Sequence, residues 1–214
     1  MKLVLYYAPQ TCALAPFITL TEAGAEFEVR NVNNRKGGNR TPEFLALNPK
    51  HKVPVLLIDG EPLTENAAIH VWVDRNFPQA RLLPADPMEH VRAISLLSWC
   101  ASSIHPRLTP NARPENYCDL PGSEESVKRV ATKLLYEDFA IADRLLAGRE
   151  WFFPHFTAPD AHFFWCFRRA ISFGIDVSGF GNCKAHLDRM LERASVQKAV
   201  AHEKKVMEAF AKAA

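Results

Sequence analysis

The chain has 214 residues, a formal net charge of +2 and 48% hydrophobic residues, which is enough for one or two domains with a sizeable core. The small net charge gives no indication of a surface for nucleic acid or anionic membranes. We see no apolar run of membrane-spanning length and no secretory signal pattern, so we expect no membrane partner and a cytoplasmic location.

The sequence has five cysteines, an odd number without close pairs or metal-ligand spacing. This pattern fits a reducing compartment better than a disulfide framework, and it predicts no metal site. The five are Cys12, Cys100, Cys118, Cys166 and Cys183.

The first 80 residues alternate strand and helix patterns. Strands are predicted at Leu3–Tyr7 and Phe27–Val32, separated by a helix from Cys12 to about Ala23. The polar, glycine-bearing segment 33–40 reads as a loop. A short helix then begins at Thr41, which is a favourable N-cap followed by proline.

Two further strands, Val53–Ile58 and Glu61–Leu63, are joined by Asp59-Gly60, a hairpin signal. A helix at Glu65–Asn76 follows. The predicted order is therefore strand, helix, strand, short helix, strand, strand, helix.

Cys12 lies where the first strand turns into the first helix. Free N–H groups and the helix dipole favour a thiolate there, so its pKa is expected to fall below the usual value of about 8.5. A strand–turn–helix with a reactive cysteine at the turn is the thioredoxin-like arrangement, and a buried structural thiol is the alternative. The third residue after it is Ala15 and not a resolving cysteine, so a partner sulfur has to come from outside, and glutathione is the obvious candidate.

A proline-rich polar segment, 76–87, separates this region from one with only helical patterns. We predict a thioredoxin-like domain at 1–80, a linker at 81–88 and an all-helical bundle domain at 89–214. Helices are predicted at Met88–His105, Glu125–Leu146, Pro159–Phe173, Lys184–Arg193 and Gln197–Ala211. The third is apolar nearly all round, as expected of a buried central helix, and Thr157 with Asp160 reads as its capping box.

Four segments resemble motifs of the cytosolic glutathione transferases, and the resemblance covers essentially the whole chain. Tyr6-Tyr-Ala-Pro-Gln-Thr-Cys12 resembles the active-site turn of the bacterial beta class. The other three are Asn48-Pro-Lys-His-Lys-Val-Pro-Val-Leu56, Leu63-Thr-Glu-Asn-Ala-Ala-Ile69 and Thr157-Ala-Pro-Asp160. Each alone is weak, but their order and spacing together are specific.

The resemblance implies a glutathione transferase that conjugates glutathione, as co-substrate and without a metal, to small hydrophobic electrophiles. It also implies a homodimer and no nucleic-acid partner. The electrophile is expected near Pro9–Thr11 and His105–Leu108, with a contribution from Phe164, Trp165 and Phe167 of the core helix. Two alternatives stay open, namely glutaredoxin-like thiol–disulfide exchange and a non-catalytic ligand-binding or interaction protein on the same fold.

The resemblance also assigns the glutathione contacts. Glu65 and Asn66, at a helix N-terminus, are expected to bind the γ-glutamyl end. Val53, before a cis Pro54, is expected to pair with the cysteinyl backbone as an added strand would. Lys36, with Arg35 beside it, and His51 are expected near the glycyl carboxylate.

Three residues compete for the sulfur of glutathione, Tyr6, Thr11 and Cys12, and the surrounding turn favours Cys12. His105 is the second catalytic candidate, since the beta class places a histidine there and an imidazole can exchange a proton with sulfur. Pro106 departs from the family pattern. Because proline disfavours helix at the preceding residue, it predicts that His105 points differently.

Overall fold

The computed structural model describes residues 1–212 and shows a four-stranded mixed sheet in its first half. The strands are β1 (Leu3–Tyr7), β2 (Glu28–Asn31), β3 (Val55–Ile58) and β4 (Glu61–Thr64). Their order in the sheet is β2-β1-β3-β4, with β2 parallel and β3 antiparallel to β1. The predicted hairpin joins β3 to β4, and its turn residues Asp59 and Gly60 have φ values of 51° and 100°, as a type I′ turn requires.

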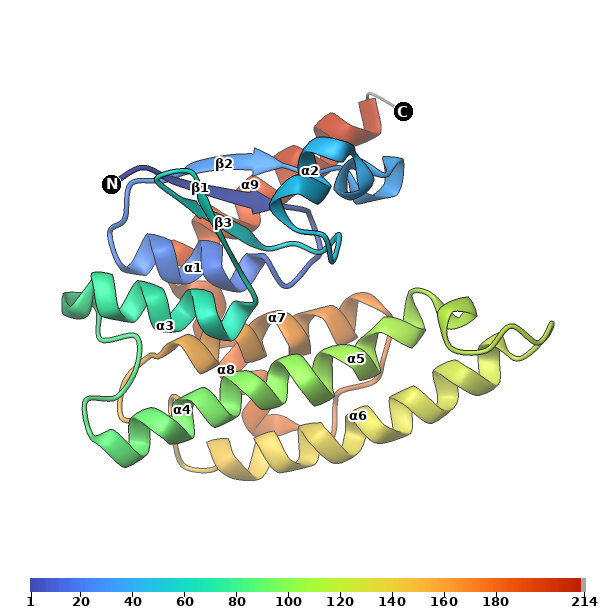
Figure 1. Ribbon diagram of the computed structural model, residues 1–214. Coiled ribbons are helices and arrows are strands. Elements are labelled where there is room, and N and C mark those ends of the chain that lie inside the picture. The colour runs from blue at the N-terminus through green and yellow to red at the C-terminus, as the bar shows by residue number, and fades with distance from the viewer. Residues whose placement is uncertain (213–214) are drawn as a thin grey trace.

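Helices cover both faces of this sheet (Figure 1). α1 (Leu14–Glu22) and α3 (Asn66–Asn76) lie on the face toward the second half of the chain, and the short α2 (Pro42–Leu47) lies on the other. The segment predicted as a loop contains two 3₁₀ turns, η1 (Asn34–Lys36) and η2 (Gly38–Arg40). The predicted thioredoxin-like domain is confirmed.

The second half is helical, which confirms the predicted all-α domain. Its long helices match the predicted ones to within a few residues. They are α4 (Pro87–Trp99), α6 (Glu124–Leu146), α7 (Ala158–Ser172), α8 (Gly181–Glu192) and α9 (Ala194–Lys212), with the shorter α5 (His105–Leu108) and the 3₁₀ turns η3 (Pro78–Ala80), η5 (Thr109–Asn111) and η6 (Pro114–Asn116). The predicted domain ends at 214, and its last two residues lie outside the described part.

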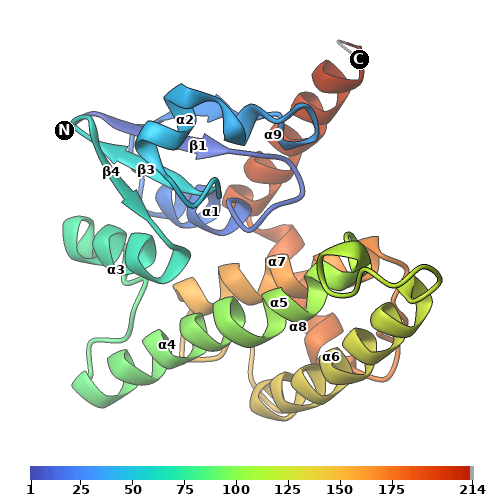
Figure 2. The ribbon, with the colours of Figure 1, turned by 45° about the vertical axis from the view of Figure 1, so that its right-hand side comes forward.

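The core of the helical domain is built around α7, which is buried along most of its length. The predicted capping box begins it: the Thr157 backbone N–H donates to the Asp160 carboxylate at 2.8 Å, and Asp160 N–H faces the Thr157 side chain. Figure 2 shows α7 between the first domain and the outer helices. Both α7 and α9 pack against α1, so two helices of the second half contact the thioredoxin-like domain.

The first long helix of the helical domain does not end at Pro106. A π-helical turn, η4 (Cys100–Ile104), connects α4 to α5, and His105 keeps helical angles of −60° and −47°. The wider turn accommodates the proline, which has no N–H and crowds the preceding turn of a regular helix. The prediction that Pro106 would disfavour helix at His105 was therefore wrong.

Candidate active site

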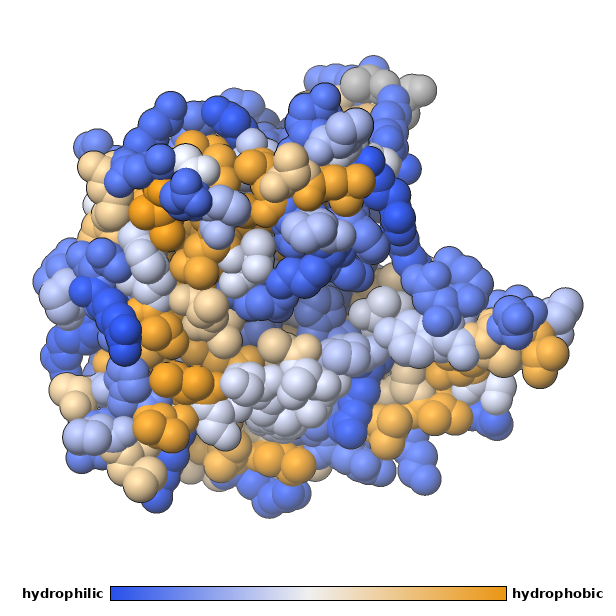
Figure 3. All heavy atoms as spheres, in the orientation of Figure 1, coloured by the Kyte–Doolittle hydropathy of each residue, from blue (hydrophilic) through white to orange (hydrophobic). Residues whose placement is uncertain are grey.

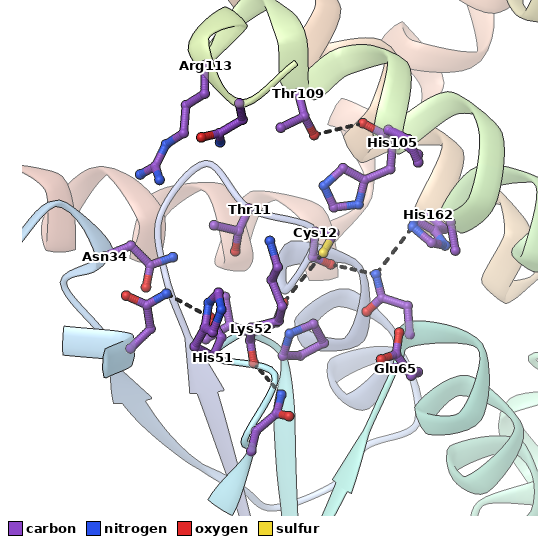
Figure 4. Close-up of a pocket in the computed structure, with 18 of the residues that line it drawn as sticks. Thr11, Cys12, Asn34, His51, Lys52, Glu65, His105, Thr109, Arg113 and His162 are labelled. Carbon is purple, nitrogen blue, oxygen red and sulfur yellow. Dashed lines mark hydrogen bonds between the residues drawn. The ribbon is translucent and has the colours of Figure 1, made fainter. Parts of the chain in front are cut away.

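A cavity of about 720 Å³ opens between the two domains (Figure 4). Loops after β1 and before β3 and the start of α3 form one wall, and the turn η4, α5 and the segment 109–117 form most of the other. Its lining residues are Thr11, Cys12, Asn34, Asn39, Arg40, Asn48, His51, Lys52, Val53, Pro54, Glu65 and Asn66 on the first side, and Ala101, His105, Pro106, Thr109, Arg113, Asn116, Tyr117 and His162 on the second.

Cys12 lies in this cavity as a buried thiol, 7% exposed. Helix α1 begins only at Leu14, so the cysteine precedes the first helical turn. Its S–H donates to the Val53 carbonyl oxygen at a sulfur–oxygen distance of 3.7 Å. Burial raises the pKa of the Cys12 thiol to about 12, which outweighs the lowering by its own backbone N–H, Asn66 and Lys52. The predicted lowering of its pKa was therefore wrong, because desolvation opposes the charge.

The Val53–Pro54 peptide bond is cis, as predicted. Two asparagine amides hold the loop that leads to it. The Asn39 Nδ2 donates to the His51 carbonyl and the Asn48 Nδ2 to the Lys52 carbonyl, both at 2.7 Å. These bonds fix the backbone that presents Val53 beside Cys12.

Glu65 and Asn66 stand at the start of α3, at the other end of this wall. Glu65 has a positive φ of 74° and an exposed carboxylate that is paired with Lys50. Asn66 is buried, and its Nδ2 donates at 3.2 Å both to the Cys12 carbonyl and to His162 Nε2. The free N–H groups of the first α3 turn suit a carboxylate, so this corner offers complementary groups for an amino acid end.

Comparisons with known proteins agree with this geometry. Residues 1–75 match the model of the glutathione S-transferase N-terminal domain. The chain is 31% identical over 203 residues to glutathione S-transferase GstA of Escherichia coli O157:H7, covering 93% of this chain and 98% of that one. The chain belongs to the glutathione S-transferase family.

Solved transferase structures confirm the resemblance to the bacterial beta class. The beta-class glutathione S-transferase of Sphingomonas chungbukensis is 33% identical, with a TM-score of 0.81 over 94% of this chain and 98% of that one. A sphingomonad glutathione S-transferase in complex with glutathione is 30% identical, with a TM-score of 0.82 and the same coverage. Relatives also include the maleylacetoacetate isomerase of Pseudomonas aeruginosa, 32% identical over 72% of this chain and 73% of that one.

His105 lines the cavity of this transferase in spite of the proline that follows it. Figure 4 shows its imidazole directed toward Cys12 from the helical side. The ring packs edge-on against Trp165, with 4.5 Å between ring centroids. Burial, with help from Lys52 and Arg169, lowers the pKa of His105 to about 4, so the imidazole is neutral at neutral pH.

Tyr6 lies outside this cavity. Its hydroxyl accepts from Arg30 Nη1 at 3.0 Å, and its ring packs edge-on against Phe44. Tyr7 points to the opposite face of the sheet, because successive side chains of a strand alternate, and its hydroxyl donates to Glu203 Oε1 at 3.2 Å. The structure thus removes Tyr6 from the candidates for contacting the glutathione sulfur.

Thr11 lines the cavity, but its hydroxyl already has partners. It donates to the Ala8 carbonyl at 2.7 Å and accepts from the Ala13 N–H at 3.3 Å. These bonds shape the turn that carries Cys12, which makes Thr11 a support for the cysteine.

Arg35 and Lys36 do not line the cavity, contrary to expectation, although their segment does contribute Asn34, Asn39 and Arg40. The side chain of a 3₁₀ turn is directed by tertiary packing, and the sequence alone could not select among these neighbours. His51 does line the cavity, at a positive φ of 48°.

Sequence reasoning missed Lys52, Arg113 and His162. Lys52 is the residue after His51 in the Asn48–Leu56 motif, so the sequence offered a reason to expect it near the glycyl carboxylate as well. Arg113 belongs to an irregular segment with no apolar period, and His162 is a single polar residue next to the apolar run 163–167 of a buried helix. Phe164 and Phe167, which were expected near the electrophile, are fully buried in the core.

Glu203 of α9 supports the cysteine turn from behind. Its carboxylate is buried, accepts from the Gln10 N–H at 2.8 Å and pairs with Arg168 at 2.6 Å. The same oxygen that binds Gln10 also accepts from the Tyr7 hydroxyl. The turn before Cys12 is therefore held by the last helix of the chain.

Glutathione is the co-substrate of this family, as the bound glutathione in the sphingomonad structure illustrates. Among residues 1–212, no group of three or more His, Cys, Asp and Glu side chains is arranged to hold a metal ion. None of the helices in this described range combines the length and apolar character needed to cross a bilayer.

Proposed function

We propose that this transferase conjugates glutathione to small hydrophobic electrophiles. The observation that carries the proposal is the union, in one cavity, of the α3 start at Glu65 and Asn66, the Val53 backbone and the Cys12 thiol. These positions would bind the γ-glutamyl end, the cysteinyl backbone and the sulfur of glutathione. The glycyl carboxylate would then lie toward His51 and Lys52, with Arg40 beyond.

The proposed chemistry is nucleophilic substitution by the glutathione thiolate. Attack on an electrophilic carbon forms the sulfur–carbon bond, the bond to the leaving group breaks with its electron pair, and the thiol proton is released to solvent. Cys12 S–H, protonated because of its burial, would donate to the thiolate in place of the Val53 carbonyl. His105, neutral and on the opposite wall, would supply a second N–H donor, so both groups favour the charged sulfur.

Thiol–disulfide exchange is the second enzymatic candidate, but the state of Cys12 argues against it. Exchange needs a thiolate at the attacking cysteine, and burial raises the pKa of Cys12 to about 12. A non-catalytic ligand-binding role is the third candidate, and it predicts glutathione binding without turnover.

The deciding test compares Cys12→Ala with wild type in conjugation and in disulfide exchange. We expect conjugation of glutathione to a chloronitrobenzene to fall by about tenfold or less, since His105 and the cavity remain, with Cys12→Ser close to wild type. Intact mass after oxidised glutathione should show little mixed disulfide. Rapid, Cys12-dependent exchange without conjugation would instead establish the glutaredoxin-like activity, and glutathione binding with neither activity would establish the non-catalytic role.

We also propose a homodimer formed through α3 and α4. A groove of about 400 Å³ lies between these helices. Figure 3 shows apolar atoms gathered over the same region, and nearby Met88 and Val91 are 61% and 60% exposed. The groove is lined by Leu63, Ala67, Ala68, Val71, Trp72, Arg75 and Ile94. A single-chain mass in sedimentation at micromolar concentration would refute the dimer.

The same proposal includes the domain limits and the location. We place the first domain at residues 1–80, the linker at 81–88 and the helical domain from residue 89 onward. The η3 turn ends at Ala80, at the first limit, and α4 begins at Pro87, two residues before the second. A cytoplasmic location is proposed because a glutathione-dependent enzyme with five free cysteines suits a reducing compartment.

A further inference from the structure

The charges that line the cavity are strongly unequal. Three cationic side chains line it, Arg40, Lys52 and Arg113, and one carboxylate, Glu65. That carboxylate is already paired with Lys50. Within residues 1–212, none of the three cations has a carboxylate at salt-bridge distance, so the cavity presents uncompensated positive charge to whatever enters it.

Two of these cations, Arg40 and Lys52, stand on the thioredoxin-like wall, next to the expected place of the glycyl carboxylate. Glutathione has one other carboxylate, at its γ-glutamyl end, and the α3 N-terminus suits it. The first wall therefore holds enough groups for both carboxylates of glutathione without Arg113.

Arg113 stands on the opposite, helical wall, on the segment between η5 and η6. Figure 4 shows its side chain extending from that wall into the cavity. The segment is anchored, since the Arg113 N–H donates to the Thr109 carbonyl at 3.0 Å and the Tyr117 hydroxyl to the Pro106 carbonyl at 3.2 Å. The guanidinium is thus carried by a fixed backbone.

The other polar groups of the helical wall are committed or uncharged. The Thr109 hydroxyl donates to the His105 carbonyl at 3.2 Å, and the Tyr117 hydroxyl donates to the Pro106 carbonyl. His105 is neutral at neutral pH. Arg113 is therefore the sole positive charge on this wall of the cavity in the described chain, and a guanidinium is a bidentate partner for a carboxylate.

We propose that the second substrate is a small electrophile that carries a carboxylate, and that Arg113 binds this carboxylate. The inference rests on the proposed conjugation and narrows its substrate class. The body of the electrophile would lie between the glutathione sulfur and the helical wall, near Ala101 and His105, with its anionic group toward Arg113. Because Arg113 is exposed, its effect should be moderate and sensitive to salt.

The test uses two electrophiles of one scaffold, 4-chloro-3-nitrobenzoate and the uncharged 4-chloro-3-nitrobenzamide. Each enzymatic rate is divided by the uncatalysed rate with glutathione, which removes the difference in intrinsic reactivity. Wild type, Arg113→Gln and Arg113→Lys are compared at saturating glutathione. Arg129→Gln is the control variant. It removes one exposed arginine of α6 that does not line the cavity.

We expect Arg113→Gln to lower kcat/KM for the benzoate by about three- to tenfold, as for an exposed charge pair with a hydrogen bond. The benzamide should change by less than about twofold, and Arg113→Lys should be intermediate. Added salt should lower the benzoate rate in wild type and in Arg113→Lys more than in Arg113→Gln. Arg129→Gln should match wild type. Glutathione KM should be unchanged in Arg113→Gln and raised in Lys52→Gln.

Several results would overturn the inference. Equal losses for the two electrophiles, or none, would show that Arg113 does not recognise the carboxylate. A raised glutathione KM in Arg113→Gln would assign the guanidinium to the glycyl carboxylate. In either case conjugation itself would stand. If wild type conjugated neither compound, the proposed function would fail and this inference with it.

Discussion

The two walls of the cavity are built in different ways. On the thioredoxin-like side, backbone groups of Val53 and of the α3 start face the cavity, and buried amides such as Asn48 and Asn66 hold them. On the helical side, the side chains of His105 and Arg113 line the cavity, carried by a π-helical turn and by 3₁₀ turns, and these are the side chains to which we assign roles in the proposed reaction. Backbone recognition depends on the fold and tolerates sequence change, whereas the helical wall can change its specificity with single residues. The fixed wall suits a constant co-substrate and the variable wall a particular electrophile.

The largest expected effect concerns two fully buried histidines where the walls meet, His162 at the edge of the cavity and His70, which does not line it. Burial lowers the pKa of His70 to about 3 and that of His162 well below its usual value. The unfolded chain takes up these protons below about pH 6.5, whereas the folded chain does not. Stability should therefore fall as pH drops below about 6.5. For His70 the loss should be about 1.4 kcal/mol per pH unit toward about pH 3, and His162 acts in the same direction.

Urea unfolding at several pH values checks this expectation. His70→Gln should reduce the slope of stability against pH between about pH 6.5 and 4 by about 1.4 kcal/mol per pH unit, the contribution expected of one histidine. Identical slopes in wild type and His70→Gln would mean that His70 takes up its proton in the folded protein as readily as in the unfolded one. The buried region where the two walls meet would then hold a charged imidazole at low pH.

The next effect tests whether the fixed wall depends on the helical half. Glu203→Ala removes the acceptor of the Gln10 N–H and the Tyr7 hydroxyl and the partner of Arg168. We expect a loss of about 2–3 kcal/mol in the free energy of unfolding, somewhat reduced because Arg168 can reach solvent, together with weaker glutathione binding.

Glu208→Ala is the control, as an exposed glutamate on the same helix. Calorimetric glutathione affinity and urea unfolding separate the two effects of the Glu203 variant. Glu203→Ala could instead match Glu208→Ala in both glutathione affinity and the free energy of unfolding. The turn before Cys12 would then not depend on α9, and the thioredoxin-like wall would be independent of the helical domain.

A smaller effect concerns the γ-glutamyl corner. Glu65→Ala removes the carboxylate proposed to accept the γ-glutamyl ammonium. Because a hydrogen bond between charged groups is lost, we expect glutathione affinity, measured by calorimetry, to fall by about tenfold in Glu65→Ala. Glu65→Gln, which keeps a carbonyl acceptor, should recover part of this loss. Glu61→Ala, on the nearby β4 strand and outside the cavity, should bind as wild type does. Full affinity in Glu65→Ala would move the γ-glutamyl end elsewhere.

The smallest effect sharpens the contrast between the walls. His105→Gln should lower conjugation by about tenfold or less at a partly redundant site, with glutathione affinity unchanged. Because burial lowers the pKa of His105 to about 4, the ring stays neutral, and the wild-type rate should show no break from this group between about pH 5.5 and 8. A break near about pH 6.5 that vanished in His105→Gln would show that the imidazole titrates in the working enzyme.

The sequence determined the architecture and most of the fixed wall. Period-two and helical patterns located the strands and long helices, and local turn chemistry located the Asp59-Gly60 hairpin and the Thr157–Asp160 capping box. The resemblance to the glutathione transferases, carried by the order and spacing of four motifs, grouped Cys12, Val53, Glu65 and Asn66 in one site. The hairpin and the capping box depend on local backbone preference, which a short stretch of sequence carries.

Only the tertiary structure decided the rest. The protonation of Cys12 depends on burial by both domains, and burial is a property of the packed chain. The side of the sheet that Tyr6 faces, the direction of His105 after the π-helical turn and the choice of Lys52 over Lys36 all depend on packing between distant segments. Arg113 lies in an irregular segment without a periodic signal, so its approach to the cavity came from long-range contacts that no local pattern encodes.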